Sequence, residues 1–135
     1  TYHNKCDYKG ETITIIKSHL HTIFGGYAVI PWSRGNKYED DPNAFLFQLH
    51  PNISVFKHKY GNGCNAVFHS DEAFLVNFGG NDLEIYDGCD KFGGNVCHPK
   101  YYDIDESYQL IGKKSSDDYG EFKVNDIEMF QIQYL

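Results

Sequence analysis

The chain has 135 residues, of which 41% are hydrophobic, 16% aromatic and 23% charged, and this length and composition predict a single folded domain. The formal net charge of −7, with Arg34 as the only arginine, argues against a nucleic-acid-binding protein. No apolar run reaches the roughly 18 residues that predict a transmembrane helix, so direct membrane insertion is not expected.

The first third of the chain predicts a β-hairpin. Residues 11–17 alternate threonine and isoleucine, a turn is expected at 18–21, and a second strand is expected over 22–30. The paired glycines at 25–26 predict a bulge or a close backbone approach inside that second strand. A polar loop is expected over 31–42.

The middle of the chain predicts one buried strand and several alternating ones. Residues 43–49 form a near-continuous apolar run, so we expect Phe45, Leu46 and Phe47 all to be buried in a central strand. The glycines at 61–63 are a strong turn signal. Four further strands are expected over residues 53–57, 64–69, 74–78 and 83–86.

The last third predicts one long loop and one strand. Residues 87–118 are rich in Gly, Asp, Ser and Lys, which favours an irregular surface loop held in places by tyrosines. The last strand is expected over 122–134, with a bulge near Asp126 or Met129 where the apolar parity changes. Eight or so short strands without helical periodicity predict a mainly β fold, a two-sheet antiparallel β-sandwich.

Residues that could carry chemistry do not form a specific motif. His19 and His21 stand two apart, but solvated histidines are favoured over a metal site. The acidic segments 40–41 and 103–106 only loosely imitate calcium loops, and solvated acidic loops are favoured there. No catalytic triad or phosphate loop is present, so we predict no catalytic residue, no metal and no cofactor.

The cysteines Cys6, Cys64, Cys89 and Cys97 form no C-x-x-C pair. Two disulfides would be expected if the protein were secreted. Cys64 lies at a turn near Lys57, His58 and Lys59, which leaves open a thiol-dependent redox enzyme.

Five segments in order resemble the TLDc domain family. They are Cys6-Asp7-x-Lys9-Gly10-x-Thr12, Phe24-Gly25-Gly26-Tyr27 followed by Trp32, Asp41-Pro42-Asn43-Ala44-Phe45-Leu46-Phe47, Phe78-Gly79-Gly80, and Ile127-Glu128-Met129-Phe130. The segments look most similar to protist copies of the domain. The positions that the resemblance marks as structural are Cys6, Asp7, Gly10, Phe24, Gly25, Gly26, Trp32, Phe45, Phe47, Phe78, Gly79, Gly80, Ile127, Glu128 and Phe130.

The resemblance implies a β-sandwich with a few short helices and no established catalytic residues. It also implies that residues 1–135 are a single TLDc-like domain, a fragment of a longer chain that lacks the N-terminal part of the domain and so has an open sheet edge. The implied function is a non-catalytic module that docks on a large assembly, with regulation of the vacuolar-type proton ATPase through its peripheral sector, or protection against oxidative stress, as leading roles. A scaffold component of a cytoskeletal complex is the alternative. Free thiols and a place in the cytoplasm, or on the surface of an organelle or cytoskeletal assembly, are expected on the same ground.

Overall fold

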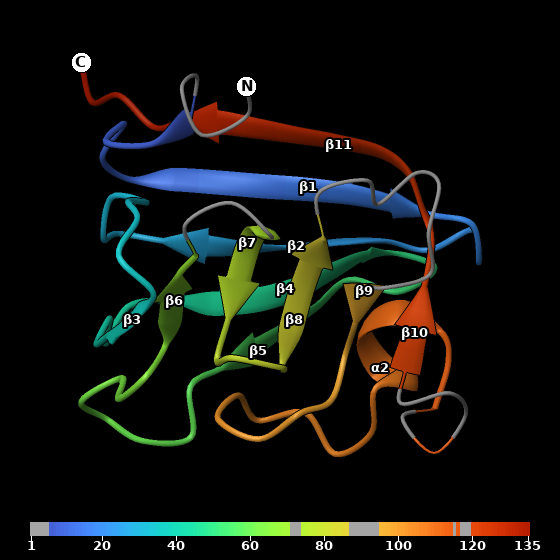
Figure 1. The fold of residues 1–135 in the computed structure, drawn as a ribbon. Helices are drawn as coiled ribbons and strands as arrows, with labels where there is room; N and C mark the ends of the chain where they lie inside the picture. Colours follow the sequence, from blue (N-terminus) through green and yellow to red (C-terminus); the bar gives the residue numbers. More distant parts are fainter. Residues whose placement is uncertain (1–5, 71–73, 87–94, 115, 117–119) are drawn as a thin grey trace.

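The structure is a computed structural model that describes residues 6–70, 74–86, 95–114, 116 and 120–135 (Figure 1). Within these residues the chain forms eleven strands and one short helix. In chain order they are β1 (Thr12–Ser18), β2 (Ile23–Ala28), β3 (Lys37–Glu39), β4 (Phe45–His50), β5 (Ser54–Lys57), β6 (Val67–His69), β7 (Phe74–Phe78), β8 (Leu83–Tyr86), β9 (Asn95–Val96), α2 (Tyr108–Ile111), β10 (Glu121–Phe122) and β11 (Val124–Gln131).

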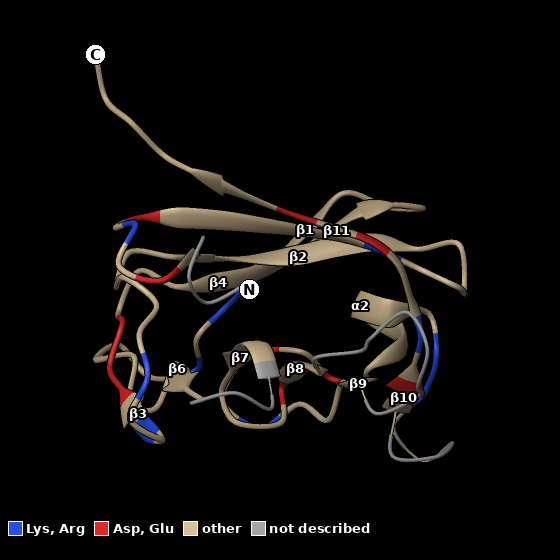
Figure 2. Cartoon of the chain, turned by 45° about the horizontal axis from the view of Figure 1, so that its top comes forward, with Lys and Arg blue, Asp and Glu red and all other residues tan. Residues whose placement is uncertain are grey.

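The strands form two antiparallel sheets packed as a sandwich, which confirms the predicted fold class. Sheet A has five strands in the order β11-β1-β2-β4-β5, and sheet B has six in the order β10-β9-β8-β7-β6-β3. Figure 2 shows the two layers nearly edge-on, with α2 at one end of the space between them. No helix among the described residues is long and apolar enough to cross a membrane.

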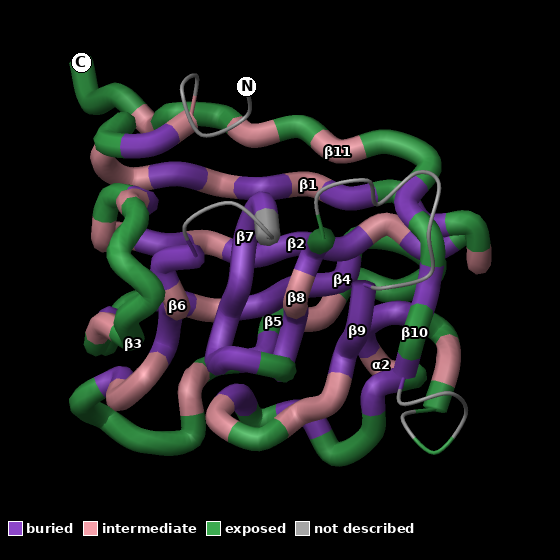
Figure 3. Tube along the Cα trace, in the orientation of Figure 1, coloured by how far each residue is buried: buried purple, intermediate pink, exposed green. Residues whose placement is uncertain are grey.

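The core fills the space between the two sheets. Ile16 of β1 and Phe24 of β2 are cross-strand partners, and both are fully buried on the inner face of sheet A. Phe78 of β7 and Leu83 of β8 are partners on the inner face of sheet B and are also fully buried. The central strand β7 is therefore mostly buried, whereas most of β11 is exposed or half-buried (Figure 3).

The two Phe-Gly-Gly segments meet across the core, where Gly26 lies against the ring of Phe78. A Cβ atom built on Gly26 of β2 would lie 2.4 Å from the ring of Phe78. A Cβ atom on Gly25 would lie 1.8 Å from the carbonyl oxygen of Thr14 on β1. Of the two predictions for this glycine pair, the close approach is therefore confirmed, because the register shift of β2 against β4 falls at Ile23/Phe24 and not at the glycines.

The prediction of an irregular surface loop over 87–118 is wrong for residues 95–111. This stretch contains β9 and α2, and it buries Tyr102, Ile104, Leu110 and Ile111 almost completely. Tyr102 donates a hydrogen bond of 2.8 Å from its hydroxyl to the carbonyl oxygen of Ala66, so the segment fills the end of the core. Residues 87–94, 115 and 117–118 of the predicted loop lie outside the described residues.

Asp82 fixes the same segment from the turn between β7 and β8. Its Oδ2 accepts backbone N–H bonds of 2.8, 2.9 and 2.9 Å from Lys100, Tyr101 and Tyr102, and the residue is fully buried. Burial raises the pKa of Asp82, while these three backbone hydrogen bonds act in the opposite direction. One buried carboxylate thus ties three consecutive amides to sheet B.

Two other segments differ from their predictions. The loop expected over 31–42 contains the short strand β3, which pairs with β6 in sheet B. The last predicted strand is divided at Lys123 into β10 of sheet B and β11 of sheet A. Within β11 the register passes from Lys17 opposite Asp126 to Ser18 opposite Val124, which confirms an irregularity beside Asp126.

Candidate interaction surface

Most positions that carry the family resemblance are buried. Nine of the fifteen are buried, namely Asp7, Phe24, Gly25, Gly26, Trp32, Phe47, Phe78, Gly79 and Gly80. Cys6, Gly10, Phe45 and Ile127 are half-buried. Only Glu128 and Phe130 are exposed, so among these fifteen positions β11 contributes the two with most access to a partner.

The chain before β1 is held by structural contacts to the segment after β2. The carbonyl oxygen of Trp32 accepts a 2.7 Å hydrogen bond from the backbone N–H of Tyr8. The indole Nε1 of Trp32 donates a 3.1 Å hydrogen bond to the hydroxyl of Thr12. Arg34 Nε lies 3.3 Å from the largely buried carboxylate of Asp7. The indole ring also packs edge-on against Phe78 at 5.3 Å between centroids. These contacts give Asp7 and Trp32 a structural role, because they hold the start of the chain against the segment after β2.

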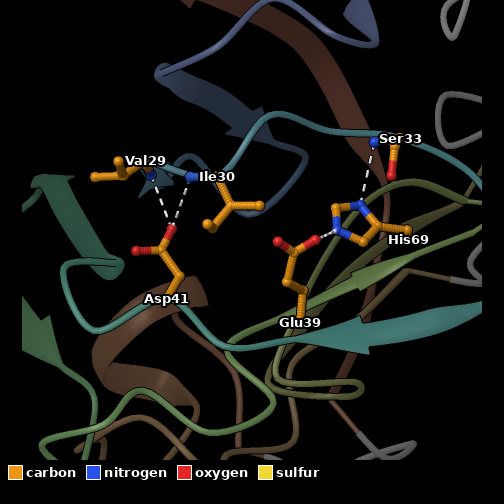
Figure 4. A network of polar contacts seen from close by, with 6 residues as sticks. All are labelled: Val29, Ile30, Ser33, Glu39, Asp41 and His69. Atoms are coloured by element: carbon orange, nitrogen blue, oxygen red, sulfur yellow. Dashed lines mark hydrogen bonds and ion pairs between the residues drawn. The ribbon is translucent and has the colours of Figure 1, made fainter.

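Two polar residues, Asp41 and His69, fix the loop between β2 and β4 (Figure 4). Asp41 Oδ2 accepts backbone N–H bonds of 2.8 and 3.1 Å from Val29 and Ile30. His69 Nδ1 accepts a 3.1 Å bond from the backbone N–H of Ser33, and this leaves Nε2 to donate to Glu39 at 2.9 Å. The carboxylate of Asp41, which belongs to the acidic segment 40–41, is therefore engaged in hydrogen bonds with backbone amides.

The described residues hold no cluster of three or more His, Cys, Asp or Glu side chains suited to a metal ion. His19 and His21 lie in the turn between β1 and β2, where they do not share a strand face. Cys64 is half-buried, and the ring of His58 contacts its carbonyl oxygen at 2.8 Å. Cys97 is fully buried, and burial raises the pKa of its thiol well above the ordinary value. Cys89 lies outside the described residues.

The outer face of sheet A carries apolar side chains across all five strands. The residues that point away from sheet B form two adjacent rows of cross-strand partners. Together, these residues are Phe130, Ile13, Tyr27, Phe45 and Lys57 in one row, and Glu128, Ile15, Gly25, Phe47 and Val55 in the next. We call this set the outer face.

Aromatic rings form the centre of the outer face. The Tyr27 and Phe45 rings stack at 4.9 Å, and Phe45 lies edge-on to Phe47 at 6.2 Å. Leu46 and Phe47 are buried as predicted, but the prediction for Phe45 is wrong because its ring lies half-buried on the outer face. Val55 is 57% exposed and Phe130 46% exposed, so both ends of the rows are open to solvent.

In a strand with one exposed face, the apolar side chains usually point into the core and the polar ones outward. The first four residues of β1 show the opposite arrangement. Thr12 and Thr14 point inward and are 1% exposed, whereas Ile13 and Ile15 point outward and are half-buried. Among the described residues, the hydroxyl of Thr14 has no hydrogen-bond partner. Sequence reasoning missed the outer face because it assumes that the more apolar face of a strand points into the core.

Glu11 and the C-terminal tail border the outer face. The carboxylate of Glu11 accepts hydrogen bonds from the hydroxyls of Tyr27 and Tyr134, the second at 2.6 Å. These two bonds lower the pKa of Glu11. The backbone N–H of Ile132 donates to the carbonyl oxygen of Glu11 at 2.9 Å, so the tail continues the pairing of β11 with β1.

Comparison with known proteins gives matches over nearly the whole chain. A model of the TLDc domain family matches residues 1–133. Nuclear receptor coactivator 7 of Mus musculus is 22% identical over 132 residues, which cover 98% of this chain and 13% of that protein. The MTOR-associated protein MEAK7 of Homo sapiens is 28% identical over 51 residues, which cover 38% of this chain and 11% of that protein. The chain thus spans only a small part of the relatives that it matches.

Proposed function

Because the chain belongs to the TLDc domain family, we propose that it is a non-catalytic module that docks on a larger protein assembly through the outer face of sheet A. One observation carries the proposal: β1 places isoleucines outward and threonines inward, and this apolar pattern continues across β2 and β4. No described helix lies over this face (Figure 2).

Burial of the outer face supplies a driving force for association. Complete burial of a valine or phenylalanine side chain stabilises by about 1.5–3 kcal/mol, and Val55 and Phe130 retain about half of their surface for a partner to cover. The outer face is half-buried or buried in its middle and exposed at Val55 and Phe130, and exposed apolar groups on a contiguous apolar surface are typical of protein-interaction sites. Lys57 and Glu128, one at each side of the face, add polar contacts at the border.

The resemblance stated above makes the peripheral sector of the vacuolar-type proton ATPase the leading partner. Two relatives are named for an association with other proteins, as a nuclear receptor coactivator and as an MTOR-associated protein. Both names agree with an interaction module. We place the protein in the cytoplasm or on the surface of an organelle or cytoskeletal assembly.

Binding of the whole protein to the purified peripheral sector of the proton pump tests this proposal. We expect Val55→Lys and Phe130→Lys each to weaken binding at least tenfold, a change that corresponds to about 1.4 kcal/mol. Both positions are exposed, so folding should be retained. Tyr108→Lys is the matched control, because Tyr108 is 49% exposed but lies on α2, outside the outer face.

The outcomes separate the surface from the partner. Binding by the wild type and the control but not by the two face variants would support both parts of the proposal. A sector that binds none of the four proteins would reject the pump as partner. Equal binding by all four would reject the outer face as the docking surface.

A further inference from the structure

We propose that a pocket at one end of the sandwich binds a small uncharged molecule in which a flat apolar body carries a carboxamide group. The pocket lies between α2 and the strands β4 and β5, where α2 stands at one end of the space between the sheets (Figure 2). Its volume is about 440 Å³, within the range of about 300–1,000 Å³ that is typical of ligand-binding pockets.

The pocket is separate from the outer face of sheet A. Ser54 and Phe56 of β5 line it, whereas Val55 and Lys57 of the same strand belong to the outer face. Alternate residues of a strand point to opposite faces, so Ser54 and Phe56 point to the inner side of sheet A. A ligand in this pocket would therefore be independent of docking through the outer face. A site between a sheet and a helix also suits a small molecule better than the surface of another protein.

The lining of the pocket selects an uncharged ligand. None of its nine described residues is Asp, Glu, Lys, Arg or His, although the chain has a net charge of −7. An ionised ligand that left water for this site would find no opposite charge there, and that transfer costs free energy. A neutral polar group loses less on entering and regains it through hydrogen bonds.

Gln109 offers a hydrogen-bond donor that the described part of the protein does not use. Its Oε1 accepts backbone N–H bonds from Asp105 at 2.9 Å and from Glu106 at 3.3 Å. Only an oxygen can accept these two bonds, so the orientation of the side-chain amide is fixed. Among the described residues Nε2 has no partner, and it is not buried. Nε2 can therefore donate to a carbonyl oxygen of a ligand.

Ser54 offers the complementary hydrogen-bond acceptor. Within the described ranges its hydroxyl has no partner, and it is not buried either. Gln48 is already engaged, because its side chain donates to the carbonyl oxygen of Leu110 at 3.1 Å and accepts from the backbone N–H of Asn52 at 3.3 Å. A carboxamide can accept from Nε2 of Gln109 and donate to Oγ of Ser54, whereas a ketone can only accept.

Two aromatic side chains suit the apolar body of the ligand. Phe56 belongs to the core and is 9% exposed, and Tyr108 is 49% exposed on α2. Neither ring contacts another aromatic ring of the described residues. Pro51 adds a further apolar group to the lining. A flat apolar body can therefore pack against rings whose faces are not used in aromatic pairs within the protein.

Titration of the whole 135-residue chain with three matched probes, followed by NMR of the backbone amides, tests the inference. The probes are benzamide, benzoate and benzylamine, which share one ring and carry an uncharged carboxamide, a negative charge and a positive charge at neutral pH. We expect benzamide to shift the amide resonances of Ser54, Tyr108 and Gln109 to a plateau. Its Kd should be at least tenfold lower than the Kd of either charged probe.

Two variants make the test specific. Gln109→Glu keeps Oε1 for the backbone of Asp105 and Glu106 but replaces the donor Nε2 with a carboxylate oxygen, so it should weaken benzamide at least tenfold and strengthen benzylamine. Ser54→Ala removes the hydroxyl and should weaken benzamide about fivefold. Gln133→Glu is the matched control, because Gln133 is exposed and lies outside the pocket. Ser54→Ala remains decisive if Gln109→Glu does not fold.

Four results would overturn the inference. Equal affinity for the three probes would show that the pocket does not select an uncharged ligand. Resonance shifts confined to residues outside the pocket would place benzamide elsewhere. Unchanged benzamide binding by both variants would remove the carboxamide contacts. N-acetylphenylalaninamide, which presents its amides as a peptide does, should bind no more tightly than benzamide, and at least tenfold tighter binding would assign the pocket to a protein segment.

Discussion

The contact between Gly26 and Phe78 gives the most direct test of the packing. In Gly26→Ala the added methyl group would lie 2.4, 2.5 and 2.9 Å from three ring atoms of Phe78, so the ring must retreat by about 1 Å to reach ordinary contact. The ring is fully buried and packs against Trp32 and Tyr102, which restricts that movement. Overpacking of this kind costs about 1–3 kcal/mol.

The smaller conformational freedom of the unfolded alanine chain offsets about 0.4–1 kcal/mol of this cost. We therefore expect Gly26→Ala to lower the free energy of unfolding by about 1–2 kcal/mol, and Gly26→Val by about 3 kcal/mol. Urea denaturation measures both changes. Gly61→Ala is the control, because nothing lies within 4 Å of its Cβ position, and it should change stability by less than about 0.5 kcal/mol.

A double-mutant cycle identifies the cause of the loss. Phe78→Leu leaves more room above Gly26, so the double variant Gly26→Ala/Phe78→Leu should lose about 1 kcal/mol less than the sum of the two single losses. Additive losses would show that the ring of Phe78 is not the obstacle. A Gly26→Ala protein as stable as the Gly61→Ala control would refute the close approach itself.

Three further predictions concern stability. Burial raises the pKa of Glu84 from 4.5 to about 7. Between these two pH values the folded protein keeps a proton that the unfolded chain releases, so the free energy of unfolding falls as the pH rises through this interval. Glu84→Gln should remove this fall and stabilise by about 1 kcal/mol at pH 8, after allowance for partial exposure, and a pH-independent difference in urea unfolding would contradict it. Asp82→Ala leaves three amide donors without their acceptor and should cost about 3 kcal/mol in the same assay, whereas Asp82→Asn keeps an acceptor and should cost less than half as much. Phe47→Ala should cost about 3 kcal/mol and the half-buried Phe45→Ala about 1–2 kcal/mol, so equal losses on thermal denaturation would argue against the assigned burial.

The sequence by itself determined the local structure of most of the sandwich. The alternation in residues 11–17 and the apolar run at 43–49 predict β1 and β4, because period-two patterns and β-branched or aromatic residues favour strands independently of their neighbours. The glycines at 61–63 and 25–26 predict the turn and the close approach for the same local reason. The five segments that resemble the TLDc family in the same order along the chain also imply the β-sandwich fold class.

Tertiary structure decided the short strands and the direction in which each face points. β3 and β9 have three and two residues, and they become strands only because β6 and β8 offer partners. The chain after β9 contributes to the core because the buried Asp82 fixes it. Ile13 and Ile15 point outward because Thr12 and Thr14 face the space that Trp32 and Phe78 fill, and alternation alone cannot decide which face meets the second sheet.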